Sequence, residues 1–357
     1  MGRKSLTDIA SSQLNGNFDL EAFKKSKFLD KSIKWKPQEW LPLSPAFNDA
    51  ISLPGLPIGH ITVIRGHSDT GKTTAMIEAA IAVQKSGKLP VFIITEMKWS
   101  WEHAKTMGFN VTENKDKDGN ISYDGNFIYA DRDNLNTIED VASFISDLVN
   151  EQKKGNLPFD LVFLWDSVGS IPCQMSVDSG KNNAMWNAGA MSTQFGNFIN
   201  QSIIMSRKGS STFTNTLIVV NKIRVDYPIG NPMEKPKMRN KGGDCMYWDA
   251  SLVVTFGNIT NSGVSKIKAT KNGKEVEFAK RTKVAVDKNH ITEVTTKSAI
   301  TITAYGFIAD DDKALKEYKK DHSKEWLEVL GSDDFDVVVE SEMIEDVRDI
   351  PIEPSEE

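Results

Sequence analysis

The stretch ITVIRGHSDTGKTT, residues 61–74, decides the fold class. Its first five residues form a short apolar run typical of a buried strand. The remainder satisfies G-x-x-x-x-G-K-[ST] and leads into an alanine-rich helical sequence, which is the pattern of a P-loop. Because backbone N–H groups and the positive end of the helix surround phosphate in such a loop, the sequence predicts a nucleotide-binding α/β protein.

The P-loop residues have separate expected roles. Lys72 places its charge on the β- and γ-phosphates, and Thr73 offers its hydroxyl to Mg²⁺. The cofactors that the motif indicates are therefore ATP and Mg²⁺. The residues expected to contact them here are Gly66, His67, Ser68, Asp69, Thr70, Gly71, Lys72, Thr73 and Thr74.

Further apolar runs predict the sheet around this loop. Their near-continuous Val, Ile and Leu content fits parallel strands that are buried on both faces. A helical pattern between them begins at Thr137, a suitable N-cap, and ends at Gly155. Strands alternating with helices predict a doubly wound, mainly parallel α/β sheet. The five strand runs are residues 61–65, 90–95, 160–166, 215–221 and 250–256.

Later runs extend this sheet toward the C-terminus. Residues 280–286 and 298–306 are expected to be strands, and Asn272-Gly273 predicts a hairpin with a type I′ turn. The hairpin from Lys266 to Lys283 carries seven cations and two acids, so it is either a solvated ribbon or a secondary DNA surface.

Two carboxylates stand directly at the ends of predicted strands. Asp166 ends the run LVFLW and is placed as a Walker B aspartate that holds the metal. Glu96 follows the run VFIIT and is the candidate general base that polarises the attacking water. Strand ends in an open α/β sheet face the ligand crevice, so both side chains should lie near the P-loop.

Charge is distributed unevenly along the chain. The net charge is −6, yet residues 332–357 hold eleven acidic residues and one arginine, which leaves +4 on the remainder. This acidic run predicts a disordered tail that is either solvating or autoregulatory, competing with DNA phosphates.

Composition excludes several classes of protein. The two cysteines and five histidines do not fall at metal-ligand spacing, which argues against structural zinc and a disulfide framework. No run of about 18 apolar residues and no signal-peptide pattern occurs, so we expect a cytoplasmic protein without a membrane partner.

In this order and spacing, residues 27–308 resemble the RecA family, and among its members the phage UvsX recombinases most. The resemblance rests on FNDAISLPGLPIGHITVIRGHSDTGKTT, Glu96 with Met107-Gly108, LVFLWDSVGSIP and LIVVNKIR. It implies a DNA-dependent ATPase that forms a homo-oligomeric helical filament on single-stranded DNA and pairs it with a homologous duplex. A single-strand-binding protein and a loader are further implied partners, in a phage-infected bacterial cell.

The resemblance also implies roles for particular residues. Asn221 falls at the sensor position near the γ-phosphate, and His103 falls where the family stacks an aromatic ring on adenine. Lys288 matches a cation that reaches a neighbouring protomer's nucleotide, although His290 replaces the family's second lysine. Lys222 also departs from the pattern, because bacterial members have glutamine there to link nucleotide state to the DNA loop.

The segment from Arg224 to Lys241 is expected to be a mobile DNA-binding loop. It has five cations, two acids and no periodicity. Ile229, with Tyr227 as a second candidate, matches the position of an apolar wedge between stacked bases. Residues 172–183 match the family's first DNA loop. The expected DNA-contacting residues are Arg224, Tyr227, Ile229, Lys235, Lys237, Arg239 and Lys241.

These observations predict three regions. Residues 1–50 form an N-terminal segment for protomer contacts, residues 51–308 form a RecA-like ATPase core with DNA-binding loops, and residues 309–357 form a C-terminal helix and acidic tail. The expected function is ATP-dependent recombination and repair by strand exchange. The alternatives are a helicase-type motor of the same superfamily and a non-catalytic recombination mediator.

Overall fold

The structure of the chain is a computed structural model that describes residues 19–27, 34–226, 237–258, 263–271, 273–323, 325 and 336–339. It separates into a small unit, Met1–Lys36 with Lys208–Ser210, and a large unit, Pro37–Arg207 with Ser211–Glu357. The small unit contains α2 (Leu20–Ser26). Among the described helices, none is long and apolar enough to cross a membrane.

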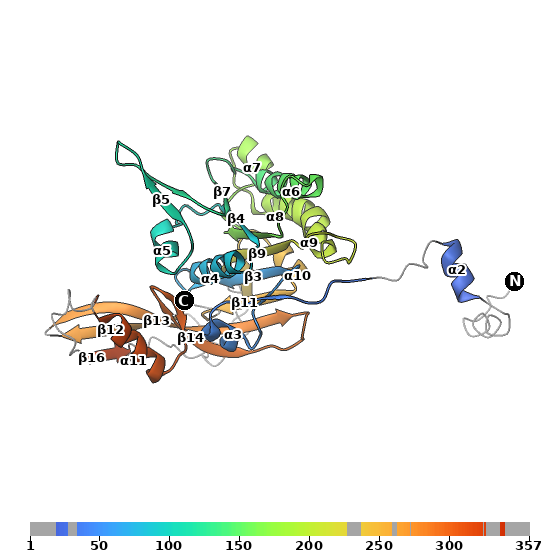
Figure 1. Cartoon of the computed structure of the whole chain (residues 1–357). Coiled ribbons are helices and arrows are strands. Elements are labelled where there is room, and N and C mark those ends of the chain that lie inside the picture. Colours follow the sequence, from blue (N-terminus) through green and yellow to red (C-terminus); the bar gives the residue numbers. More distant parts are fainter. Residues whose placement is uncertain are drawn as a thin grey trace, which may run out of the picture. The chain divides into compact units, whose positions relative to one another are not determined.

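The large unit is built on one sheet with strand order β15-β14-β13-β11-β3-β9-β8-β4-β7 along its main path (Figure 1). Neighbours from β11 to β7 pair in parallel, which confirms the mainly parallel sheet. All five predicted runs are strands. β7 is an additional parallel strand, which was not predicted because it is short and has few apolar residues. The parallel strands are β3 (Ile61–Gly66), β4 (Leu89–Ile94), β7 (Ile128–Asp131), β8 (Leu161–Asp166), β9 (Thr216–Asp226) and β11 (Leu252–Phe256).

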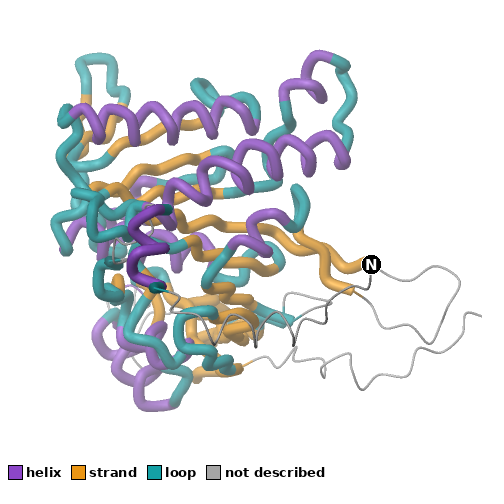
Figure 2. The backbone as a smooth tube through the Cα atoms, turned by 90° about the vertical axis from the view of Figure 1, so that its right-hand side faces the viewer, coloured by secondary structure: helices purple, strands orange, loops and turns teal. Residues whose placement is uncertain are grey.

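Two apolar cores cover the two faces of this sheet, as a doubly wound fold requires. One core joins the sheet to the P-loop helix, and the other joins it to α6 and the helices after β8. Figure 2 shows these strands and helices from the side. The first face carries α3 (Pro45–Ile51), α4 (Lys72–Lys85) and α5 (Trp101–Thr106); the second carries α6 (Ile138–Lys154), α8 (Ala184–Met191), the π-helical η1 (Ser192–Ile199), α9 (Asn200–Met205) and α10 (Cys245–Asp249).

The predicted caps of α6 are confirmed. Thr137 and Asp140 form a reciprocal capping box, and Gly155 ends the helix with φ of 85°. The helix begins and ends where these residues satisfy backbone groups that have no partner within it.

Antiparallel strands extend the sheet beyond β11, as predicted. The Asn272-Gly273 hairpin is confirmed by pairing of Lys271 with Lys274, although Asn272 itself lies outside the described residues. Figure 1 shows this hairpin projecting beside α11. These elements are β12 (Ser265–Lys271), β13 (Lys274–Asn289), β14 (Lys297–Thr303), β15 (Gly306–Ile308) and α11 (Asp312–Asp321).

Two segments expected to be irregular contain strands. Within the acidic tail, β16 (Asp336–Val339) pairs with β12, because three consecutive valines favour an extended edge strand over a solvated chain. At the basic loop, β9 continues to Asp226 and pairs with β10 (Lys237–Asn240), so the loop is rooted in a hairpin. The remaining short elements are β1 (Trp40–Leu41), β2 (Leu56–Pro57), β5 (Thr112–Lys115), β6 (Ile121–Asp124) and α7 (Gln174–Asp178).

A buried carboxylate fastens the P-loop helix to its surroundings. Glu78 of α4 accepts hydrogen bonds from the backbone N of Ser44 at 3.1 Å and its hydroxyl at 2.7 Å. It also accepts one from the backbone N of Phe307 at 2.8 Å. Burial raises the pKa of Glu78, while these three donors oppose that rise. The carboxylate therefore joins α4 to the start of α3 and to β15.

We predict that Glu78→Ala lowers the free energy of unfolding by about 2–4 kcal/mol, because it leaves largely buried donors without an acceptor. Urea denaturation measures this change. The control is Glu317→Ala on the exposed side of α11, which should change the value by less than about 0.5 kcal/mol. A Glu78→Ala protein as stable as this control would contradict the fastening role.

Candidate functional site

The carboxyl ends of β3, β4, β8 and β9 meet at one edge of the sheet. The register pairs Ile94 with Asp166, Asp166 with Val220, and Gly66 with Lys222. Glu96 lies two residues beyond the end of β4, and the backbone N of Glu96 donates to the Asp166 carbonyl at 3.1 Å. The parallel register thus brings together the P-loop and both predicted carboxylates.

The P-loop has the backbone that its glycines permit. Gly71 is the N-cap of α4 with φ of 101°, a conformation that L side chains rarely adopt. A Cβ at this position would also lie 2.8 Å from Cδ1 of Ile302 on β14. Gly71 therefore lets the loop turn into the helix while β14 packs closely against it. No side chain caps this end of α4, which leaves its first N–H groups for an anion.

Lys72, Thr73 and Asp166 form the floor of the site. The Thr73 hydroxyl donates to Oδ2 of Asp166 at 3.1 Å, and the Lys72 ammonium donates to the His67 carbonyl. Burial lowers the pKa of Lys72 to about 8, although nearby carboxylates oppose this shift. Burial, followed by the charge of Glu96, raises the pKa of Asp166 to about 6. A nearby ligand of opposite charge would stabilise the ionised form of each group.

Glu96 is held by Lys222 on β9 and by Ser167, the residue after β8. Its Oε1 lies 2.6 Å from Nζ of Lys222, and its Oε2 accepts a hydrogen bond from Ser167 at 3.2 Å. Burial alone would raise the pKa of Glu96, but Lys222 and Ser167 outweigh burial and leave this pKa below its ordinary value. The carboxylate is therefore ionised at neutral pH, as a proton acceptor must be.

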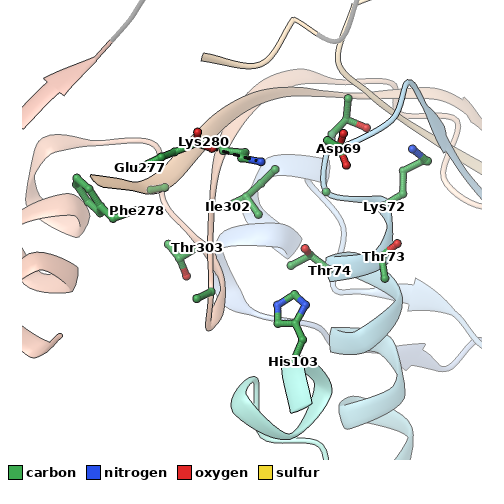
Figure 3. Close-up of a pocket in the computed structure, with 14 residues that line it drawn as sticks. Asp69, Lys72, Thr73, Thr74, His103, Glu277, Phe278, Lys280, Ile302 and Thr303 are labelled. Atoms are coloured by element: carbon green, nitrogen blue, oxygen red, sulfur yellow. Dashed lines mark ion pairs between the residues drawn. The ribbon is translucent and has the colours of Figure 1, made fainter. Parts of the chain in front are cut away.

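Two cavities adjoin at the P-loop, and Asp69, Lys72 and Thr73 border both. The smaller, of about 80 Å³, is lined by the strand-end residues Glu96, Asp166 and Lys222 and also by Ser68. The larger, of about 540 Å³, is shown in Figure 3. Its lining comprises Asp69–Thr74 on one wall, His103 from α5, and Glu277–Lys280 with Ile302–Ala304 opposite. The P-loop, whose sequence is typical of a phosphate site, therefore lies between the smaller cavity, which contains the carboxylates, and the larger cavity.

Of two further residues assigned through the family resemblance, His103 lines a cavity and Asn221 lines neither of the two. His103 borders the larger cavity, where Figure 3 shows its ring below Thr74. Asn221 is buried on β9, in register with Arg65. Within the described part of the chain its Oδ1 has no hydrogen-bond donor. A buried amide oxygen without a donor fits a site that holds a water or ligand.

An oxygen-ligated Mg²⁺ fits the residues present. The Thr73 hydroxyl and the Asp166 carboxylate are adjacent hard oxygen donors, and Mg²⁺ typically takes one or two such protein ligands beside phosphates and water. A dication would also stabilise the ionised form of the buried Asp166.

Lys288 lies away from both cavities. It pairs with Val253 on β11, toward the opposite end of the strands from Gly66. Its ammonium donates to the carbonyls of Tyr247 at 3.0 Å and Trp248 at 2.7 Å, at the end of α10. Partial burial lowers the pKa of Lys288. Within its own chain this lysine binds the end of a helix and does not contact the P-loop.

The hairpin formed by β9 and β10 is called the basic hairpin here, and charged side chains at its base are exposed. Arg224 and Arg239 face one another across β9 and β10, and both side chains are exposed, as is Lys241. For Lys237 only the backbone is described. Tyr227, Ile229 and Lys235 lie outside the described residues.

Sequence reasoning missed several residues of the site. Lys222 was named there only as a departure from the family pattern. The charge of Lys222 and its position directly after a predicted strand could have suggested an ion pair with Glu96. Ser167, next to Asp166, was not assigned a role. No sequence signal marks Glu277 or Lys280, because only the pairing of β13 with β14 carries them to the cavity.

No family model matches the chain. The protein is similar to "Protein RecA" of Streptococcus equi subsp. zooepidemicus (strain MGCS10565), with 26% identity over 296 residues, or 81% of this chain and 66% of that protein. It is similar to "Protein RecA" of Lactococcus lactis subsp. cremoris (strain MG1363), with 40% identity over 70 residues, or 20% of this chain and 18% of that protein. The aligned regions thus span less than two thirds of these relatives. Modest identity over most of the chain supports a relationship to the RecA family.

We predict that Glu96→Gln retains ATP binding but loses turnover by about 10²-fold or more, because the amide cannot accept the proton of the attacking water. Lys72→Ala should abolish hydrolysis, since the charge of the transferring phosphate loses its cation. Equilibrium nucleotide binding and phosphate release measure the two effects.

Lys85→Ala, at the exposed far end of the same helix, is the matched control and should behave as the wild type. Turnover of Glu96→Gln close to that of this control would remove Glu96 from the role of base.

Proposed function

We propose that the protein is a RecA-type, phage-like DNA recombinase that binds single-stranded DNA as a helical filament and uses ATP for homologous pairing and strand exchange. The observation that carries this proposal is the meeting of Lys72, Thr73, Asp166 and Glu96 beside the root of a basic hairpin. Similarity to RecA proteins over most of the chain supports it.

In the proposed reaction, four side chains of the smaller cavity have separate tasks. Lys72 and the N–H groups at the start of α4 bind the phosphates and offset the charge that develops on them. Thr73 and Asp166 would hold Mg²⁺, which neutralises phosphate charge when bound. Glu96, ionised at neutral pH, orients the attacking water and accepts its proton.

The ion pair between Glu96 and Lys222 supports coupling of this chemistry to DNA. While Lys222 holds Oε1 at 2.6 Å, that oxygen is occupied and less basic. Lys222 belongs to β9, which continues into the hairpin, and its carbonyl accepts a hydrogen bond from Lys241 N at 2.8 Å. DNA that reorders the hairpin would therefore shift Lys222 and release Glu96.

The exposed cations of the hairpin suit contact with a sugar-phosphate backbone. Arg224, Arg239 and Lys241 present charge at its root. Lys235, between its strands, and Lys237, the first residue of β10, add charge in the sequence. Such contacts bind single-stranded DNA without reading its sequence, and they make its affinity depend on salt.

We predict that replacing Lys235, Lys237 and Arg239 together by alanine weakens single-stranded DNA binding and reduces the slope of log affinity against log salt by about two, because three phosphate contacts are lost. ATP hydrolysis without DNA should be unaffected. Fluorescence anisotropy over a salt series measures the slope.

The control removes the same charge from α11 by replacing the exposed Lys313, Lys316 and Lys320. If both triple variants keep the wild-type slope, the DNA site lies elsewhere, with the hairpin at 266–283 as the next candidate.

A cation from a neighbouring protomer completes the proposed site. The smaller cavity is lined by Lys72, Lys98 and Lys222, but Lys98 and Lys222 both pair with Glu96. Lys288 is the residue proposed to act in trans on the neighbour's γ-phosphate. For this role, the contact between Lys288 and the end of α10 must lie at the filament interface. A cation supplied in this way accelerates phosphoryl transfer by about 10³ to 10⁵.

We predict that Lys288→Ala binds ATP normally but loses most DNA-stimulated turnover. Mixed with Glu96→Gln protein it should recover activity, because some interfaces then pair an intact Glu96 with an intact Lys288. Turnover of the mixture, compared with each variant alone, measures this. Co-assembly without any recovery would place Lys288 outside the reaction.

A further inference from the structure

The wall of the larger cavity opposite the P-loop contains an unexpected run of side chains. Glu277, Phe278, Ala279 and Lys280 are consecutive residues of β13, and all four border the cavity. In a regular strand, successive side chains point to opposite faces of the sheet. Only every second residue of a regular β13 would therefore line it.

A β-bulge in β13 accounts for this run. Ile267 pairs with Ala279 while the next residue, Lys268, pairs with Glu277, so that Phe278 is the extra residue on β13. Such a bulge re-aims side chains and is frequent beside active sites. Here the bulge turns Glu277 toward the same cavity as Lys280.

Lys280 is close enough to reach a ligand at the P-loop. It pairs with Ile302 on β14, and Ile302 is the residue that packs on Gly71. Neighbouring strands are about 5 Å apart, which is less than the length of a lysine side chain. Figure 3 shows Lys280 and Ile302 on the wall across from Asp69 and Lys72.

The present partner of Lys280 is easily exchanged. Nζ of Lys280 lies 3.3 Å from Oε1 of Glu277, and both side chains are about one third exposed. Glu277 has a second cation, Lys266, at 3.4 Å, so its charge remains paired if Lys280 moves. A partly exposed pair of this kind is weak, and a charge-assisted hydrogen bond to a phosphate is stronger.

We propose that Lys280 is a nucleotide-binding residue: it leaves Glu277 and binds the phosphate chain of a nucleoside triphosphate from the wall opposite Lys72. This inference rests on the proposed ATP site and adds a second cation to it from the same chain. Because the contact is ionic, it distinguishes nucleotides by their phosphates and not by their base.

The test compares Lys280→Ala with Lys283→Ala. Lys283 is three residues along the same strand and borders a different cavity, so it has matched charge and element but no path to the P-loop. Calorimetric titration with ATP–Mg²⁺ and with adenosine is carried out on each full-length variant in the absence of DNA. Thermal melting verifies that both variants are folded, and Lys280→Arg tests whether positive charge alone restores binding.

We expect Lys280→Ala to bind ATP about tenfold more weakly and adenosine equally well, with Lys283→Ala unchanged for both and Lys280→Arg close to the wild type. Unchanged ATP affinity of Lys280→Ala would overturn the inference, as would an equal loss for ATP and adenosine, since the latter indicates only a distorted wall. Absence of ATP binding by the wild-type protein would instead overturn the proposed function, and this inference with it.

Discussion

The parallel register of β3, β9, β8 and β4 is the constraint on which the candidate site depends. Parallel strands end at the same edge, so residues far apart in sequence meet there without long loops. The register aligns Gly66 with Lys222 and Ile94 with Asp166. One small cavity is thereby lined by Lys72, Glu96, Asp166 and Lys222. Burial there lowers the pKa of Lys72 and raises the pKa of Asp166, so it favours the neutral form of each group. A bound phosphate would stabilise the charged form of Lys72, and a bound metal cation would stabilise the charged form of Asp166.

The same constraint brings the basic hairpin to the site. Its root lies beside the turn after Asp166, where a Cβ on Gly242 would be 2.9 Å from Cα of Gly169. Gly242 has φ of 87°, so both the contact and the backbone there favour glycine. With the Lys241–Lys222 hydrogen bond, this close packing joins the hairpin to the two strands that carry Asp166 and Lys222. A movement of the hairpin would therefore act directly on Lys222 and on the turn after Asp166.

The sequence predicts the parts of the fold that depend on local pattern. The P-loop, the five buried strands and the caps of α6 each have their own signal in neighbouring residues, and the structure has them. The carboxylates Asp166 and Glu96 were predictable because they directly follow apolar runs. The Glu96–Lys222 pair, the bulge at Phe278 and β16 were not, because each depends on which strands become neighbours. The trans role of Lys288 and the DNA contacts depend on other molecules and stay predictions.

We propose that ATP at this site drives assembly on single-stranded DNA. Electron microscopy of the protein with single-stranded DNA and a slowly hydrolysed ATP analogue tests it most directly. We expect continuous helical filaments that require both DNA and nucleotide. Closed rings would indicate a helicase-type motor, and separate particles that do not associate with the DNA would contradict ATP-driven assembly.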